Sequence, residues 1–228
     1  MVRDVRTLTE LKVRALCAVT AVTAQTDTAL LAMHAIPESV VRAQIAAAFA
    51  TAAVQVVKVG MLATGATVRA VAECLVDHAH VPVVLDPVLA SSSGGVLLDL
   101  EGRARLVAEL LPLAAVVTPN LPEAALLLGL PQARDEVTAL VQAQELLRRG
   151  ARAVLLKGGH ANGPHSVDLL LAHGASPERL SAVRVGANLR GSGCALASAI
   201  AAYLAQGVPL SAACARAKNY VTALLQRS

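Results

Sequence analysis

Aromatic residues are almost absent from this 228-residue sequence, which has no Trp, one Phe and two Tyr. So few rings argue against a stacking surface for bases, and we expect no nucleic-acid partner. The core must be filled by Ala, Val and Leu instead, which favours closely packed layers of helix and sheet. With 55% hydrophobic and 16% charged residues, the sequence suits one compact domain over residues 1–228.

Cysteine pairs, an export signal and a membrane span are also missing. The four cysteines show no CxxC pair and no partnered His spacing, which argues against a disulfide framework or a structural zinc site. The first residues lack the apolar core of a signal peptide, and the Ala-rich stretch 194–205 is too short to span a bilayer. We therefore expect a cytoplasmic protein with no membrane partner. Its net charge of +4 is compatible with an anionic substrate.

Short apolar runs alternate with longer segments of helical composition along most of the chain. Runs of this kind, without polar alternation, are typical of strands buried on both faces, and their alternation with helices predicts a mainly parallel sheet. The predicted strands are Ala15–Thr23, Val54–Val59, Val83–Leu85, Ala115–Thr118 and Ala153–Leu156. The predicted helices between them are Glu38–Thr51, Thr64–His78, Glu101–Leu111 and Asp135–Arg149.

The last third of the chain has a different pattern. Two strand candidates, Val167–Ala172 and Leu180–Val185, are separated by the turn residues Gly174 and Pro177, which predicts an antiparallel edge hairpin. Two Ala-rich helices then follow, from about Gly193 to Ala205 and from Leu210 to Gln226. The sequence as a whole predicts an α/β fold.

Polar residues follow the predicted strands at the points where ligands bind to open parallel sheets. Carboxylates in such a place suit Mg²⁺, while lysine and backbone N–H groups suit phosphate oxygens. We therefore expect these residues to meet at one edge of the sheet. They are Gln25, Gly60-Met61, Asp86, Asn120 with Glu123, and Lys157 with the loop that contains His160.

A glycine-rich turn, Arg190-Gly191-Ser192-Gly193-Cys194, leads directly into a predicted helix. Its backbone N–H groups and the positive end of the helix dipole would form an anion hole for a phosphoryl group in transfer. We also expect the helix start to lower the pKa of the Cys194 thiol, so that it could act as a general base.

Each of these residues also has a plain structural explanation when taken alone. A Gly-x-Gly turn can simply cap a helix, and Cys194 could be a small packing residue. Asp86 could begin a turn, Glu123 could stabilise a first helical turn, and His160 could lie on the surface. Their joint placement at one edge favours the functional interpretation.

Several segments together resemble the bacterial hydroxymethylpyrimidine/phosphomethylpyrimidine kinases of thiamine biosynthesis, a ribokinase-like family. The resemblance runs from about Asp4 to the C-terminus, and its last motifs are the most specific. The matching pieces are TAVTAQT (20–26), KVGML (58–62), LDPV (85–88), TPNLPEA (118–124), KGGH (157–160) and GSGC (191–194).

This resemblance implies a three-layer α/β/α fold, Mg²⁺ as cofactor, ATP as phosphoryl donor and a homodimer. It implies pyrimidine contacts from Gln25, Met61 and Val88. It further implies that nucleotide and metal are positioned by Asp86, Asn120, Glu123 and Lys157, with Asp86 and Glu123 as metal ligands. Gly191, Ser192 and Gly193 would form the anion hole, and Cys194 would help to deprotonate the hydroxymethyl group.

Two departures from the family pattern have consequences. The family usually begins with a strand and a Gly-rich loop before the segment that stands here as Asp4–Thr7. If Met1 is the true start, we expect that strand and part of the pyrimidine pocket to be missing, which would leave an exposed sheet edge. Arg190 stands where the family usually has histidine, and its charge could hold a phosphate or crowd it.

Three functions remain open from the sequence. The leading hypothesis is ATP-dependent phosphorylation of hydroxymethylpyrimidine and then of its monophosphate. A catalytically silent paralogue that binds a pyrimidine or a nucleotide is the second, and a pyridoxal-type kinase is the third.

Overall fold

The computed structural model describes residues 1–26, 28–91, 94–158, 164–186 and 189–227, and its centre is a six-stranded sheet. The strand order is β3-β4-β5-β6-β7-β8, parallel from β3 to β6 and antiparallel from β6 to β8. The predicted mainly parallel sheet with an antiparallel edge hairpin is confirmed. The strands are β3 (Val57–Val59), β4 (Val83–Leu85), β5 (Ala114–Val117), β6 (Ala153–Leu156), β7 (His165–Ala172) and β8 (Glu178–Val183).

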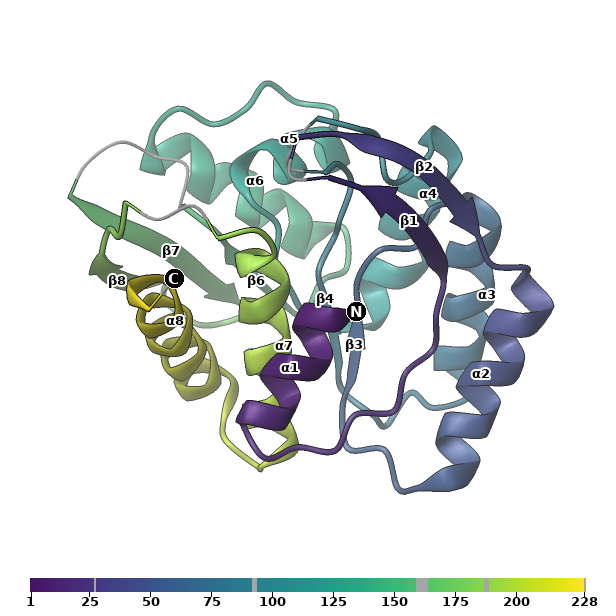
Figure 1. The fold of residues 1–228 in the computed structure, drawn as a ribbon. Coiled ribbons are helices and arrows are strands. Elements are labelled where there is room, and N and C mark those ends of the chain that lie inside the picture. The colour runs from purple at the N-terminus through teal and green to yellow at the C-terminus, as the bar shows by residue number, and fades with distance from the viewer. Residues whose placement is uncertain (27, 92–93, 159–163, 187–188, 228) are drawn as a thin grey trace.

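Helices cover both faces of this sheet and give the predicted three layers (Figure 1). On the near face lie α1 (Val2–Glu10), α7 (Ser192–Ala205) and α8 (Leu210–Gln226). The other helices pack on the opposite side. They are α2 (Glu38–Thr51), α3 (Gly65–Val76), α4 (Leu100–Arg105), which continues through a π turn and a 3₁₀ turn to Leu113, α5 (Leu121–Leu128) and α6 (Glu136–Arg148).

The core consists of two apolar layers, one on each face, because successive side chains of a strand point to opposite sides. In β4, Val83 and Leu85 join the layer beneath α3, whereas Val84 joins the layer beneath α7. Most of the buried residues are Ala, Val and Leu, so the small side chains allow helix and sheet to pack closely. This agrees with the near absence of aromatic residues.

The prediction of a buried sheet strand at Ala15–Thr23 is wrong. The structure instead has β1 (Ala21–Gln25) paired with β2 (Leu30–Ala35) in a separate antiparallel sheet, and the residues of β1 are half-buried or exposed. An apolar run without alternation does not reveal which sheet it joins or whether both its faces are covered. Neither β2 nor α1 was predicted.

The outer edge of β3 is open in the part of the chain that the structure describes, since β3 pairs only with β4. A long cleft of about 1470 Å³ runs along this region and continues to the carboxyl ends of the strands. No helix among the described residues is both long and apolar enough to cross a membrane.

Candidate active site

The polar residues predicted after β4, β5 and β6 do meet at one edge of the sheet. Asp86 follows β4 directly, Asn120 follows β5, and Lys157 follows β6. The backbone N–H of Lys157 donates to the carbonyl of Pro119 at 2.8 Å, and Asn120 and Lys157 form a parallel bridge. The backbone therefore fixes these two residues next to each other before any side-chain contact is considered.

Asp86 is the centre of a buried cluster of charges. Its side chain is only 2% exposed, and the Lys157 ammonium lies 3.1 Å from its Oδ1 atom. The Thr118 hydroxyl is 3.3 Å from the same oxygen. Burial would raise the pKa of Asp86, but the charges of Lys157 and Lys58 outweigh this effect and lower it, so the carboxylate stays ionised.

Glu123 lies on the other side of Lys157, with its Oε2 atom 3.7 Å from the Lys157 ammonium. It also closes a capping box at the start of α5, because Asn120 N–H donates to Glu123 at 2.7 Å and Glu123 N–H donates to Asn120 at 2.8 Å. Burial and the nearby Asp86 charge raise the pKa of Glu123 against the opposing effect of Lys157. A second cation beside the two carboxylates would relieve the repulsion between Glu123 and Asp86.

The glycine-rich turn adopts the conformation that its sequence predicts. Gly191 has φ +80°, a left-handed value that glycine adopts without strain, and α7 begins at Ser192. The Ser192 N–H already donates to the Leu189 carbonyl at 3.1 Å. A side chain at Gly193 would meet the Lys157 ammonium at 3.2 Å, so this lysine lies at the start of the helix.

The expectation that the helix start lowers the pKa of Cys194 is wrong. Burial raises the pKa of this thiol to about 11, and the Asp86 charge adds to the effect, while Lys58 and Lys157 only partly oppose it. Cys194 also hydrogen-bonds to Asp86. Dipole effects act within one helical turn, whereas desolvation depends on packing that the local sequence does not show.

Alkylation can check this state of Cys194. We expect iodoacetamide at pH 8 to label the exposed Cys17 rapidly and Cys194 slowly, because the thiolate is the reactive form. The rate at Cys194 should still be rising at pH 9.5. Peptide mass spectrometry of timed reactions would measure both rates in one sample. Labelling of Cys194 as fast as Cys17 at pH 8 would contradict a raised pKa.

The predicted pyrimidine contacts line the same cleft as the charged cluster. Met61 is half-buried just beyond β3, and its carbonyl accepts a hydrogen bond from the Thr20 hydroxyl at 2.6 Å. Val88 is half-buried beyond β4, and Gln25 is exposed at the end of β1. His160 lies outside the described residues. The cleft is lined by Gln25, Met61, Asp86, Val88, Asn120, Glu123, Lys157, Gly191, Ser192, Gly193 and Cys194.

Two charged residues of this site, Lys58 and Asp4, were missed from the sequence. The Lys58 ammonium lies 2.9 Å from Asp4 and 3.7 Å from Asp86, and its side chain is only 11% exposed. Lys58 stands in the quoted KVGML segment, but nothing local indicates that it reaches Asp4 on α1. Arg190 donates instead to the Thr26 carbonyl at 2.8 Å and so links the anion-hole turn to the end of β1.

A buried ion pair on another part of the sheet fixes Gly158, the residue that follows Lys157. Lys218 on α8 lies 2.8 Å from Asp168 on β7, and the two side chains are 8% and 5% exposed. The other Asp168 oxygen accepts the Gly158 N–H at 3.0 Å. A Cβ at Gly158 would lie 1.9 Å from the Val167 carbonyl oxygen, so the close approach requires glycine.

A metal site made by protein ligands alone is not found among the described residues, since no group of three or more suitable side chains occurs there. Asp86 and Glu123 nevertheless fit a Mg²⁺ ion, because one buried and one half-buried carboxylate lie beside the same ammonium group. Mg²⁺ commonly takes one or two carboxylates and completes its coordination with water and substrate phosphates.

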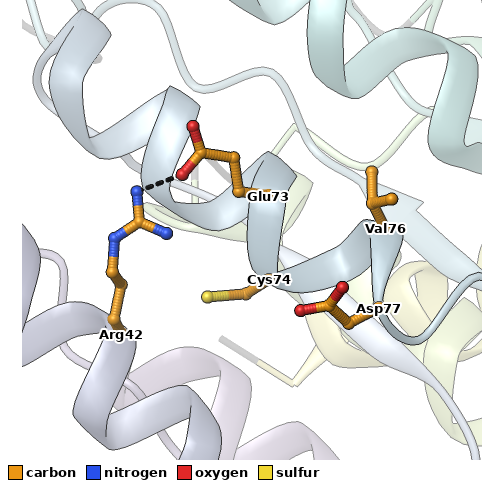
Figure 2. Close-up of a pocket in the computed structure, with 5 residues that line it drawn as sticks. All are labelled: Arg42, Glu73, Cys74, Val76 and Asp77. Atoms are coloured by element: carbon orange, nitrogen blue, oxygen red, sulfur yellow. Dashed lines mark hydrogen bonds and ion pairs between the residues drawn. The ribbon is translucent and has the colours of Figure 1, made fainter.

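A second, smaller hollow lies on the surface of α2 and α3, away from this edge of the sheet (Figure 2). Arg42 and Glu73 face each other across it and form an ion pair. Cys74, Val76 and Asp77 complete its lining. Its lining carries one cation and two carboxylates, and none of the predicted site residues lies there.

Comparisons with known proteins give the family of this chain. The family model described as phosphomethylpyrimidine kinase matches residues 1–228. A hydroxymethylpyrimidine/phosphomethylpyrimidine kinase of Rhizobium meliloti is 43% identical over 223 residues, which cover 97% of this chain and 83% of the relative.

Two solved structures share the fold. A phosphomethylpyrimidine kinase of Clostridium difficile has a TM-score of 0.83 at 30% sequence identity. The superposed region covers 97% of this chain and 90% of the Clostridium chain. The pyridoxal kinase of Staphylococcus aureus in complex with pyridoxal has a TM-score of 0.88 at 28% sequence identity. The superposed region covers 98% of this chain and 81% of the pyridoxal kinase. The predicted ribokinase-like fold is confirmed. Because the family model spans the whole sequence, the chain belongs to the phosphomethylpyrimidine kinase family.

Proposed function

We propose that this chain transfers the γ-phosphoryl group of ATP to 4-amino-5-hydroxymethyl-2-methylpyrimidine and then to the resulting monophosphate, in thiamine biosynthesis. One observation carries the proposal. Lys157 lies between the buried Asp86, the half-buried Glu123 and the start of α7, in a cleft lined by all the residues to which the family resemblance gives a role. A cation, carboxylates and a helix N-terminus are the groups that phosphoryl transfer requires.

The donor side of the cleft is formed by Asn120, Glu123, Lys157 and the Gly191–Gly193 turn. Burial alone would lower the pKa of Lys157, but Asp86 and Glu123 outweigh it and keep the lysine charged. This charge lies at the start of α7, where the helix dipole also favours an anion. Both act in a partly buried place and would stabilise the negative charge that develops on the phosphoryl group during transfer.

Asp86 and Glu123 would hold the Mg²⁺ ion that accompanies ATP. When bound, such an ion neutralises charge on the phosphate oxygens and helps to orient them. Glu123 keeps one carboxylate oxygen on the α5 cap, so the helix start orients this ligand. Asp86 is oriented by Thr118 and by the two lysines on either side.

Cys194 is the candidate base for the first transfer only. The hydroxymethyl oxygen attacks the γ-phosphorus, the bond to ADP breaks, and the hydroxyl proton must leave. Because the thiol has a pKa of about 11, its thiolate is a minor species at neutral pH but a stronger base once formed. In the second transfer the attacking group is already an anionic phosphate, so no proton has to be removed by a base.

Cys194→Ser tests this assignment. We expect it to lower kcat/KM of the first transfer about a hundredfold, because a serine hydroxyl ionises far less readily than a thiol and is much more rarely in the anionic form that accepts a proton. The second transfer should lose clearly less. Coupled measurement of ADP release on each acceptor gives the two values, and Cys74→Ser, on α3, serves as a matched control. Equal losses in both transfers would reject the role of Cys194 as a base.

The function itself is tested by ADP release that depends on hydroxymethylpyrimidine, ATP and Mg²⁺. We expect turnover with the pyrimidine and with its monophosphate, and a much lower kcat/KM with pyridoxal. No substrate-dependent turnover by a folded chain would reject the proposal. If calorimetry then detected ligand binding, the chain would be a silent binding protein. A higher kcat/KM with pyridoxal than with the pyrimidine would show that the chain is a pyridoxal-type kinase.

We also propose that the chain acts in the cytoplasm as a homodimer. The four free cysteines support a reducing compartment. The exposed apolar side chains of Val22, Leu31 and Met33 on the β1–β2 sheet support association between copies. Sedimentation velocity of the purified protein measures the oligomeric state.

A further inference from the structure

Asp86 lies between two half-buried lysines that approach it from different directions. Lys157 is 3.1 Å from Oδ1, whereas Lys58 is 3.7 Å from Oδ2. Their side chains are 13% and 11% exposed, and both line the cleft. In the mechanism described above, only Lys157 acts on the phosphate groups, and Lys58 merely helps to orient Asp86. A second half-buried ammonium group at the same carboxylate therefore needs its own explanation.

The surroundings of the two lysines differ in a consistent way. Lys157 lies beside Glu123 and the start of α7, on the side where the donor phosphates would bind. Lys58 lies beside Asp4, and a side chain at Gly60 would meet its Nζ atom at 2.7 Å. Gly60 immediately precedes Met61, the predicted contact of the pyrimidine ring. Lys58 thus belongs to the acceptor side of Asp86.

Two carboxylates keep the ammonium group of Lys58 in place. Asp4 lies 2.9 Å from it and Asp86 lies 3.7 Å from it, so its charge is compensated within the fold. Asp4 is itself held by the Ser198 hydroxyl at 2.8 Å, which ties the pair to α7. An ammonium group has three N–H donors. The two carboxylate contacts of Lys58 therefore leave a donor for an additional oxygen.

We propose that Lys58 binds the phosphate group of the monophosphate acceptor during the second phosphoryl transfer. This inference rests on the proposed function. In that transfer a phosphate oxygen of the acceptor attacks the γ-phosphorus, a new P–O–P bond forms, and the bond to ADP breaks with its electron pair on ADP. Two anions must approach each other beside Asp86, and Lys58 offsets their repulsion. The first acceptor is a neutral alcohol and gains much less from this charge.

The test compares the two acceptors in a charge-balanced double variant, Asp4→Asn with Lys58→Met. Removing Lys58 alone would leave Asp4 without its lysine partner, with only the Met1 ammonium group and the Ser198 hydroxyl beside it, so Asp4→Asn alone is the matched control. We expect kcat/KM for the monophosphate, divided by kcat/KM for the alcohol, to fall about thirtyfold in the double variant. Lys58→Arg should restore much of this ratio because it keeps the charge. Lys157→Met should lower both transfers.

The outcomes separate this inference from the proposed function. An unchanged ratio, or parallel losses on both acceptors, would overturn the role of Lys58 and indicate only a structural contact. Calorimetry with each acceptor in the absence of ATP gives a second readout, in which the double variant should lose affinity for the monophosphate alone. If the unaltered protein turns over neither acceptor, the proposed function fails, and selective loss of monophosphate binding would still support Lys58.

Discussion

Replacing Asp86 with asparagine is expected to lower kcat/KM for both phosphoryl transfers about a thousandfold. The side chain is 2% exposed and lies between the Lys157 and Lys58 ammonium groups. Asparagine nearly preserves its volume but removes the charge that orients both lysines and would bind the metal ion. Because the change affects the region where donor and acceptor meet, neither transfer should be spared.

ADP release with each acceptor measures this loss, and thermal unfolding shows whether the variant is folded. Asp77→Asn is a suitable control, because Asp77 is an exposed carboxylate at the end of α3 and lies in the smaller hollow of Figure 2. A tenth or more of the original kcat/KM in a folded Asp86→Asn variant would show that this carboxylate is not central to the chemistry.

The second large effect is expected on stability. Lys218→Met should lower the free energy of unfolding by about 3 kcal/mol, because it leaves the Asp168 carboxylate buried without its cation. Lys218 lies 2.8 Å from Asp168 and also donates to the Ser166 hydroxyl at 3.0 Å. Since Asp168 holds the Gly158 N–H, the KM for ATP should rise as well.

Urea unfolding of the variant and of the original protein measures this difference. Lys12→Met, at an exposed lysine after α1, controls for the substitution itself. The double variant Asp168→Asn with Lys218→Met should recover part of the loss, because both charges are then absent. An unfolding free energy for Lys218→Met equal to that of the original protein would show that the pair contributes little.

The sequence predicted those parts of the fold that depend on local pattern. The runs at Val83–Leu85 and Ala153–Leu156 are strands, and the polar residues that follow them meet, because parallel strands end at the same edge. The edge hairpin and the two final helices also follow from turn residues and composition. These features require no knowledge of which distant segments touch.

The features that the sequence did not predict depend on distant contacts. The run Ala15–Thr23 resembles a buried strand in composition, yet its only strand residues pair with β2 outside the main sheet. The role of Lys58 depends on Asp4, which lies on another element. The raised pKa of Cys194 comes from burial, whereas the local motif indicated the opposite shift.

The first helix is held almost entirely by the end of the chain. Arg3 donates to the Arg190 carbonyl, Asp4 accepts from Ser198, and Leu11, just after α1, accepts from Gln206. Isolated helices of nine residues are marginal in water. During synthesis on the ribosome, α1 emerges before residues 190–206 and must wait for them before it can dock. The nascent chain should therefore acquire its cleft only after α7 has left the ribosome, whatever the order in which the strands of the sheet form.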